Sequence, residues 1–249
     1  MAVEKGPFLT TRRSLLGAGV AAVMGGPTLA AGFSGKAAAQ DGTLASHDDV
    51  YLSAAVRSAR WIRSAQVARE VGIAWLPEPD HPEKRITQGP DNTLYSGSAG
   101  TVLFFLELAR ATADSSYLED ARRGADYLAA SWEQLPGKDS SAVLADHGLS
   151  FDEGLAGVAF ALAETWKATD MTTYRDAAVK ATRALAAAAT PKGKGVEWMS
   201  SPAVGLGGGI ILYLLYAART FDDRRLLELA MRGGDRDRKS TRLNSSHVD

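Results

Sequence analysis

Residues 94–106 read LYSGSAGTVLFFL, and this stretch decides how the rest of the chain is interpreted. A short polar segment runs into two glycines three positions apart, Gly97 and Gly100, and an apolar run follows them directly. A helix that is apolar on nearly every side is typical of a buried helix. Glycines spaced by three lie on one edge of a helix, where they let a neighbouring backbone approach closely. We therefore expect a buried helix that begins at a close contact.

Two further copies of this arrangement follow along the chain. Gly154 and Gly157 precede a second apolar run, and Gly205 and Gly208 precede a third. The first glycines of the three copies are 57 and 51 residues apart (154 − 97 and 205 − 154). Regular spacing of this kind is the sequence signature of an architecture that repeats one supersecondary unit.

An amphipathic segment completes each of the first two units. Its apolar residues recur at helical spacing, which predicts a second helix with one buried face. They are Tyr117, Ala121, Ala125, Leu128 and Trp132 in the first unit, and Tyr174, Ala178, Ala181, Leu185 and Ala188 in the second. Ser116 with Glu119, and Thr173 with Asp176, have capping-box spacing where these helices should begin. Residues 50–70 predict another helix, and strand patterns are nearly absent. The prediction is an all-α fold of repeated helical hairpins.

Composition excludes several classes of function. Hydrophobic residues make up 45% of the 249 residues and charged residues 23%, which is ordinary for a folded globular protein. The formal net charge of −1 argues against broad electrostatic attraction to nucleic acid or anionic lipid, so no nucleic-acid partner is expected. The sequence contains no cysteine, which removes disulfides, cysteine nucleophiles and thiolate metal ligands from these residues.

The first 39 residues predict an export signal. Arg12 and Arg13 precede an apolar run over residues 15–32, and three alanines at 37–39 offer a cleavage site. Paired arginines, a mildly hydrophobic run and small residues are similar to a twin-arginine signal peptide. The alternative is a membrane anchor, which the five glycines and one proline of that run disfavour. We predict a protein exported to the periplasm or beyond, with no stable membrane span after the signal is removed.

The last 13 residues, 237–249, differ in character from the rest. They begin DRKSTRLNSSH, which resembles one reading frame of a common sequencing adapter. The string is polar and shows no helical periodicity, so we expect it to be foreign to the folded domain. On this interpretation residues 40–236 are the N-terminal part of a longer domain, and the repeat array is incomplete.

The sequence of residues 94–106 resembles the first repeat of the lanthionine synthetase C-like (LanC-like) family, and the resemblance extends over residues 50–234. It implies an α/α toroid, in which inner helices are ringed by outer helices in about seven hairpins. It also implies a peptide-modifying function. The family's enzymes use zinc, held by two cysteines and a histidine in later repeats, to add a peptide thiol to a dehydrated serine or threonine.

The chain departs from the family pattern at the positions that matter for zinc. It has no cysteine, and Glu153-Gly154 stands where the family often has a histidine and a glycine. We therefore assign no metal ligand in these residues. Two interpretations stay open: zinc is bound by residues of the full-length protein beyond this sequence, or this is a divergent toroid without cyclase activity.

The richest candidate site is the segment that leads into the second apolar helix. It contains Asp146, His147, Asp152 and Glu153. A histidine near carboxylates is suited to general acid–base catalysis, because burial can separate their pKa values. The same acids are also favoured at a helix N-terminus for purely structural reasons.

The corresponding segments before the first and third apolar helices supply candidate ligand-binding residues. They are Asp91, Asn92 and Tyr95 in the first segment and Trp198 in the third. Tyr95 and Trp198 could line a peptide or sugar site by stacking, or could pack as structural anchors. Two alternatives to the peptide function therefore remain: an exported carbohydrate-active toroid that uses loop carboxylates, and a binding module without catalysis.

Overall fold

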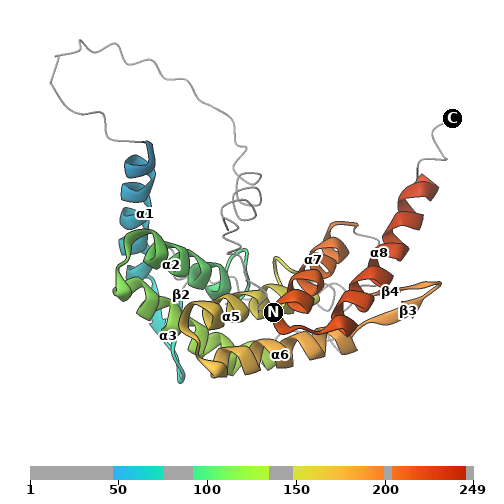
Figure 1. Ribbon diagram of the computed structural model, residues 1–249. Coiled ribbons are helices and arrows are strands. Elements are labelled where there is room, and N and C mark those ends of the chain that lie inside the picture. The colour runs from blue at the N-terminus through green and yellow to red at the C-terminus, as the bar shows by residue number, and fades with distance from the viewer. Residues whose placement is uncertain (1–46, 76–91, 135–147, 199–203, 245–249) are drawn as a thin grey trace, which may run out of the picture. The chain divides into compact units, whose positions relative to one another are not determined.

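The fold is known from a computed structural model, which describes residues 47–75, 92–134, 148–198 and 204–244 (Figure 1). The chain divides after Leu44 into two units, and every described residue belongs to the second. The predicted signal and residues 76–91 and 135–147 therefore lie outside what the structure describes.

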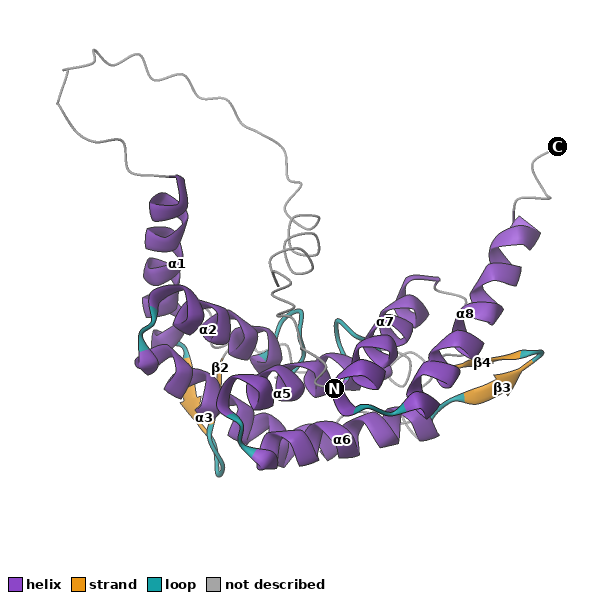
Figure 2. Cartoon of the chain, in the orientation of Figure 1, coloured by secondary structure: helices purple, strands orange, loops and turns teal. Residues whose placement is uncertain are grey.

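The described residues are mainly helical (Figure 2). The helices are α1 (His47–Ser64), α2 (Ser98–Thr112), α3 (Ser115–Ser131), a 3-10 turn η3 (Trp132–Gln134), α5 (Leu155–Thr169), α6 (Thr172–Ala187), α7 (Val204–Phe221) and α8 (Arg224–Asn244). Two small antiparallel strand pairs are inserted, β1 (Gln66–Ala68) with β2 (Ile73–Trp75), and β3 (Thr190–Lys192) with β4 (Gly195–Glu197). The all-α fold predicted from the sequence is confirmed.

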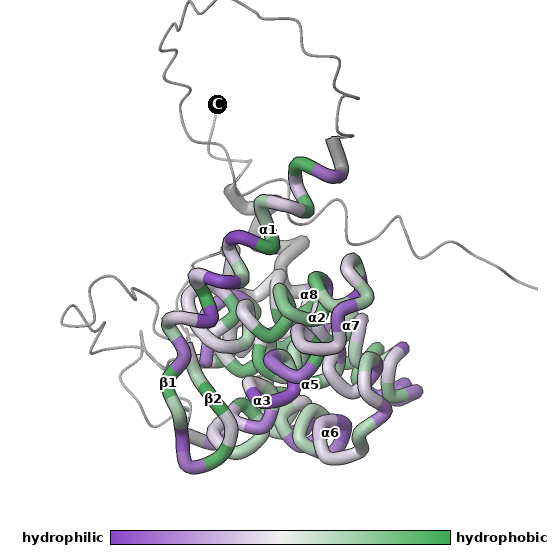
Figure 3. Tube along the Cα trace, turned by 90° about the vertical axis from the view of Figure 1, so that its left-hand side faces the viewer, coloured by the Kyte–Doolittle hydropathy of each residue, from purple (hydrophilic) through white to green (hydrophobic). Residues whose placement is uncertain are grey.

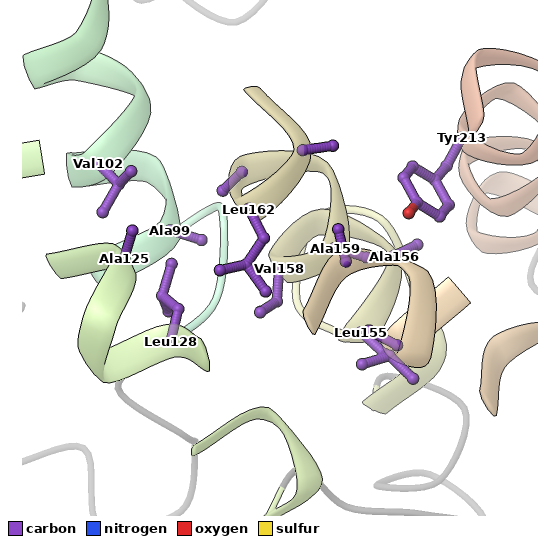
Figure 4. Packing of buried hydrophobic residues seen from close by; sticks show 14 of the residues in the cluster. Ala99, Val102, Ala125, Leu128, Leu155, Ala156, Val158, Ala159, Leu162 and Tyr213 are labelled. Carbon is purple, nitrogen blue, oxygen red and sulfur yellow. The ribbon is translucent and has the colours of Figure 1, made fainter. Parts of the chain in front are cut away.

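The helices pair as three consecutive hairpins, α2 with α3, α5 with α6 and α7 with α8. Each first helix packs on the next, α2 on α5 and α5 on α7, and the second helix α3 packs on α6. Figure 4 shows the junction of the first two hairpins, where Val102 of α2 and Leu128 of α3 face Val158 and Leu162 of α5. All four side chains are fully buried. We call α2, α5 and α7 the inner helices and α3, α6 and α8 the outer helices.

The predicted faces of the outer helices are the buried ones. Tyr117 and Tyr174 are 6% and 0% exposed, and the alanines and leucines that follow them at helical spacing are fully buried. Trp132 and Ala188, at the ends of the two sets, are half-buried. Burial of this face is what holds an amphipathic helix of ordinary propensity in place.

The outer helices begin earlier than the predicted capping boxes. Asp114 is the N-cap of α3, and its side chain accepts a hydrogen bond from the Ser116 N–H at 2.8 Å. Met171 is the N-cap of α6 and makes no side-chain cap. Ser116 and Thr173 therefore lie within the first turn, and the capping-box prediction is wrong. Aspartate is as good an N-cap as serine, so Asp114 can take that position in α3.

Each inner helix ends on a residue in the left-handed conformation, and these residues fix the register of the repeat. They are Ala113 (φ 55°), Asp170 (φ 56°) and Asp222 (φ 54°). The first two lie 16 residues after Gly97 and Gly154 (113 − 97 and 170 − 154), but Asp222 lies 16 after Leu206 (222 − 206). The next residue, Asp223, accepts a hydrogen bond from the Arg225 N–H as Asp114 does from Ser116. The third unit is therefore counted from Leu206, one residue later than the sequence suggested.

Residues 50–70 were expected to be one helix, but α1 ends at Ser64 and the chain turns into β1. Gly72, with φ of +72°, makes the turn into β2 that a side chain would strain. Figure 3 shows hydrophilic and hydrophobic residues alternating along α1, as suits a helix with one covered face. On that face the Arg63 guanidinium donates to Asp120 Oδ2 of α3 at 2.6 Å and lies 4.6 Å from the centre of the Tyr117 ring.

A tryptophan at the end of β2 (Trp75) and another directly after β4 (Trp198) each pack on an outer helix. A Cβ at Gly124 of α3 would lie 2.6 Å from Trp75 Cζ3, and one at Gly233 of α8 would lie 2.8 Å from Trp198 Cζ3. Both glycines lie 27 residues after the start of their unit in the corrected register (124 − 97 and 233 − 206). The glycines are needed because an indole ring occupies the space of their side chains.

Candidate functional site

The segments that enter α2 and α5 have the same local structure. The Thr93 hydroxyl accepts a hydrogen bond from the Ser96 N–H at 3.2 Å, and the Ser150 hydroxyl accepts one from the Glu153 N–H at 3.0 Å. Thr93 and Ser150 each lie four residues before their first glycine (97 − 93 and 154 − 150). Serine and threonine favour such turns because the hydroxyl replaces a backbone acceptor. The repeat therefore extends to the loops.

The two loops are also joined directly. The Tyr95 N–H donates to the Asp152 carbonyl oxygen at 2.8 Å, although the residues are far apart in sequence. We call residues 92–97 and 148–154 together the loop surface. Because each loop carries its own turn and the two share a backbone hydrogen bond, the side chains on this surface are presented by fixed backbone.

The second glycine of each unit is the position on which the loop rests. A Cβ at Gly100 would lie 2.2 Å from the Leu94 carbonyl oxygen, and one at Gly157 would lie 2.1 Å from that of Phe151. A Cβ at Gly157 would also lie 3.0 Å from Leu94 Cβ of the preceding loop. Real Cβ atoms are essentially never found this close to a carbonyl oxygen, so only glycine fits.

In the third unit the corresponding position is Gly209, not Gly208 as predicted. A Cβ at Gly209 would lie 2.8 Å from Phe151 Cβ, whereas one at Gly208 would meet no atom within 4 Å. Leu94 thus lies against Gly157, and Phe151 against Gly209, so each loop reaches the glycine of the next hairpin. Gly205, the first glycine of the predicted motif, is outside the residues whose side chains are described.

The structure places the predicted loop residues in different environments. The Tyr95 side chain is 73% exposed, Asp152 is exposed and Glu153 is half-buried. Asn92 is 3% exposed, and its Oδ1 has no hydrogen-bond partner among the residues that the structure describes. The loop surface therefore presents an aromatic ring and a carboxylate from neighbouring loops. The other predicted residues, Asp91, Asp146 and His147, lie outside the described residues.

Trp198 is part of the core. Its side chain is 7% exposed, and its Nε1 donates to the Leu185 carbonyl oxygen at 2.9 Å. This hydrogen bond and the packing of the ring on Gly233 support the second interpretation of Trp198, a structural anchor of the third hairpin. A ring buried in this way has no free face on which a sugar or peptide could stack.

Sequence analysis missed a set of polar contacts between consecutive hairpins. The Tyr174 hydroxyl donates to Asp126 Oδ1 at 2.8 Å, and the Tyr216 hydroxyl donates to Glu164 Oε1 at 2.5 Å. Burial raises the pKa of both tyrosines, and the acceptor carboxylates raise it further. The hydroxyls thus stay protonated as donors. The repeated tyrosine at 117 and 174 was a signal for the first of these contacts, but nothing in the sequence identified its partner.

The model of the family described as lanthionine synthetase C-like protein matches residues 90–238, which is more than half of the chain. The chain belongs to the lanthionine synthetase C-like family. The hairpin array is accordingly that of a LanC-like α/α toroid, and the match begins at the loop surface. A search of curated proteins found no match.

The residues present do not fit the zinc site of LanC-like enzymes. The sequence contains no cysteine, and the part of the chain that the structure describes holds no group of three or more histidine, aspartate and glutamate side chains able to bind a metal. No zinc-dependent step is therefore derived for these residues. Over the same described residues, no helix is both long and apolar enough to cross a bilayer.

Proposed function

We propose that this LanC-like chain binds peptides at the loop surface. The observation that carries the proposal is the Tyr95 side chain, which is 73% exposed on a loop tied to its neighbour. Tyrosine supplies a large contact area with few rotatable bonds, which suits a residue of a recognition surface. Asp152 adds a carboxylate that pairs with a peptide N–H or a basic side chain.

Peptide binding is proposed ahead of thioether cyclisation because the ligands of the family's zinc are not among these residues. The family is one of peptide-modifying toroids, so a peptide is the partner that the family match supports. The carboxylates that a glycoside hydrolase would need in pairs are represented on the described loops by Asp152 and Glu153 alone.

The test is the affinity of the full chain for labelled peptides rich in serine, threonine and basic residues, measured by fluorescence anisotropy. Tyr95→Ala is expected to weaken binding about tenfold. Tyr51→Ala is the matched control, because Tyr51 is exposed to nearly the same extent, 71%, but lies on α1. Equal losses in both variants would contradict the proposal. Binding of oligosaccharides that depends on Tyr95, without peptide binding, would replace it with the carbohydrate function.

We also propose that the protein is exported through the twin-arginine pathway. Arg12 and Arg13, followed by the Gly- and Ala-rich run and the alanines at 37–39, support this. Replacing both arginines with lysine keeps the charge but removes the paired guanidinium groups. The variant is expected to stay in the cytoplasm of a host in which the natural sequence is exported. Equal export of the two would contradict the proposal.

A further inference from the structure

The residues that seat the loops entering α2 and α5 are chemically alike in the two loops. Thr93 and Ser150 each accept a hydrogen bond from the backbone N–H three residues later. The carbonyl oxygens of Leu94 and Phe151 each lie against the second glycine of their own unit. The pairs match as hydroxyl with hydroxyl and apolar side chain with apolar side chain. The repeat thus shows which residue types the scaffold requires at these positions.

The position just before the turn breaks this match. It is Asn92 in the first loop and Leu149 in the second, each five residues before the first glycine of its unit (97 − 92 and 154 − 149). Both residues are buried, at 3% and 6% exposed. Asparagine and leucine both branch at Cγ, so the two loops bury side chains of similar shape. One loop nonetheless buries an amide where the other buries an apolar group.

The amide of Asn92 is not satisfied by the scaffold. Its Oδ1 is buried and has no hydrogen-bond partner in the part of the chain that the structure describes. Buried polar groups of folded proteins are almost always hydrogen-bonded, because an unpaired one lowers stability. Leucine avoids this cost at the equivalent place in the second loop. The amide therefore has no role in seating the first loop.

We propose that the Asn92 amide hydrogen-bonds to the main chain of the bound peptide. The inference rests on the proposed function, because Asn92 belongs to the loop surface. A carboxamide has both a donor and an acceptor, as a peptide unit does, so it accepts from a peptide N–H and donates to a peptide carbonyl oxygen. Rotation about its two side-chain bonds brings the amide from its buried place to the peptide.

The exposed Tyr95 lies close enough for one peptide to meet both residues. Asn92 comes three residues before Tyr95, which places their Cα atoms at most about 11 Å apart. An extended peptide covers that distance with about three or four residues. A peptide that packs on the Tyr95 ring therefore runs within reach of the Asn92 side chain.

This contact defines the class of peptide that the site accepts. Every residue except proline presents the same backbone N–H and carbonyl groups. Asn92 therefore recognises main chain and not sequence, while Tyr95 and Asp152 contact side chains. The site binds peptides of varied sequence, but it discriminates against a chain that lacks the N–H at the contacted position, because the amide is then left unpaired.

The first test is the stability of Asn92→Leu in the full chain, measured by urea denaturation. The variant is expected to keep or raise the denaturation midpoint, because it removes an unpaired amide and copies the second loop. Leu149→Asn is the reverse exchange and should lower the midpoint, because it buries an amide in place of an apolar group. A lower midpoint for Asn92→Leu would show that the amide supports the fold and would overturn the proposal.

The second test measures binding of the labelled peptide by fluorescence anisotropy. Asn92→Leu is expected to weaken binding about tenfold. A series of the same peptide, each member methylated at one backbone nitrogen, locates the contact. One member should bind the natural chain about tenfold more weakly, yet bind Asn92→Leu as tightly as the unmethylated peptide does, because the same hydrogen bond is removed from either side.

The results separate this inference from the proposed function. If Tyr95→Ala weakens peptide binding and Asn92→Leu does not, the proposed function stands and the role of Asn92 is wrong. If every methylated peptide loses the same factor in the natural chain and in Asn92→Leu, the amide does not contact the main chain and the inference is again overturned. If the natural chain binds no peptide, both proposals fail.

Discussion

At the residue scale, each unit of the repeat depends on one glycine, because the space of its side chain is taken by the preceding loop. Gly100 and Gly157 both lie against the carbonyl oxygen of the residue six positions earlier, and neither could carry a Cβ without moving that backbone. The loop that bears Tyr95 and the loop that bears Asp152 are seated in this way. A glycine that looks like a helix-weakening residue in the sequence is therefore required for the position of the loop surface.

The glycine positions give the first prediction. Gly157→Ala should lower the free energy of unfolding by about 1–3 kcal/mol, because the new methyl would overlap the Phe151 backbone. Gly209→Ala should also destabilise, whereas Gly208→Ala should be neutral or stabilising, since its Cβ would meet open space and alanine favours a helix. Urea denaturation of the three variants measures this. Equal effects at 208 and 209 would show that the corrected register is wrong.

A second prediction concerns the hydroxyl that joins α6 to α3. Tyr174→Phe should cost about 1.5–3 kcal/mol of unfolding free energy, because Asp126 loses a hydrogen bond from a fully buried ring. Tyr51→Phe, in an exposed ring on α1, should change stability little. Denaturant midpoints of the two variants provide the comparison, and similar midpoints would contradict the assigned role of Tyr174.

At the element scale, the Arg63 guanidinium anchors α1 because it contacts several groups of α3 at once. Arg63 donates to Asp120 and, at 2.9 Å, to the Ser116 hydroxyl, while its plane lies near the Tyr117 ring. Asp120 is 8% exposed, and its Oδ1 also accepts a hydrogen bond from the Gln66 amide at 3.2 Å. One side chain thus ties α1 to the first outer helix.

The third prediction follows from that anchor. Arg63→Ala should lower the unfolding free energy by about 1–3 kcal/mol, because a hydrogen bond to a charged, buried group is lost. Arg57→Ala, at an exposed position of the same helix, is the control and should have a small effect. Thermal melting of both variants checks the prediction. If the two variants have the same melting temperature, the prediction is wrong and α1 is held by its apolar face alone.

The fourth prediction concerns the N-cap of α3. The hydrogen bond from the Ser116 N–H holds the pKa of Asp114 below its usual 3.8. A pKa that is lower in the folded state stabilises the fold above the unfolded value, and that stabilisation is lost as pH falls below 3.8 through the folded value. Asp114→Asn keeps a cap and should match the natural melting temperature only well below pH 3.8, where Asp114 is protonated, and should therefore lose less on acidification. Asp114→Ala should melt a few degrees lower at neutral pH. Identical acid sensitivity of the Asn variant would contradict the assignment.

Sequence reasoning found the elements better than it found their exact positions. The apolar runs and the faces that begin at Tyr117 and Tyr174 were predictable, because burial imposes helical spacing on the sequence. The register of the third unit was not, because four glycines stand among residues 205–209, and it took the left-handed Asp222 and the contact of Gly209 with Phe151 to show which of them counts. The strand pairs were missed since three-residue strands are too short to show alternation.

The candidate site was predictable in part for a similar reason. Loop residues of the right chemistry could be named, but their exposure could not, because it depends on packing between hairpins. Tyr95 and Trp198 were both candidate ligand-binding residues in the sequence. In the structure the Tyr95 ring is exposed, whereas the Trp198 ring packs on Gly233 in the core.

At the scale of the whole molecule, the repeat explains how one LanC-like chain combines a site with a scaffold. Successive hairpins place their loops side by side, and each loop is fixed by its own turn and by the glycine of the next inner helix. The polar contacts of Tyr174 and Tyr216 hold consecutive hairpins in this order. In the proposed function, adjacent loops bind the peptide together, and the fold holds these loops in place.

The most direct test of that claim is hydrogen–deuterium exchange of the full chain with and without the labelled peptide that binds best. The account predicts slower exchange over residues 92–97 and 148–154 when the peptide is bound, with the outer faces of α3 and α6 unchanged. Protection confined to the outer helices, or no change over the loop surface at saturating peptide, would contradict it.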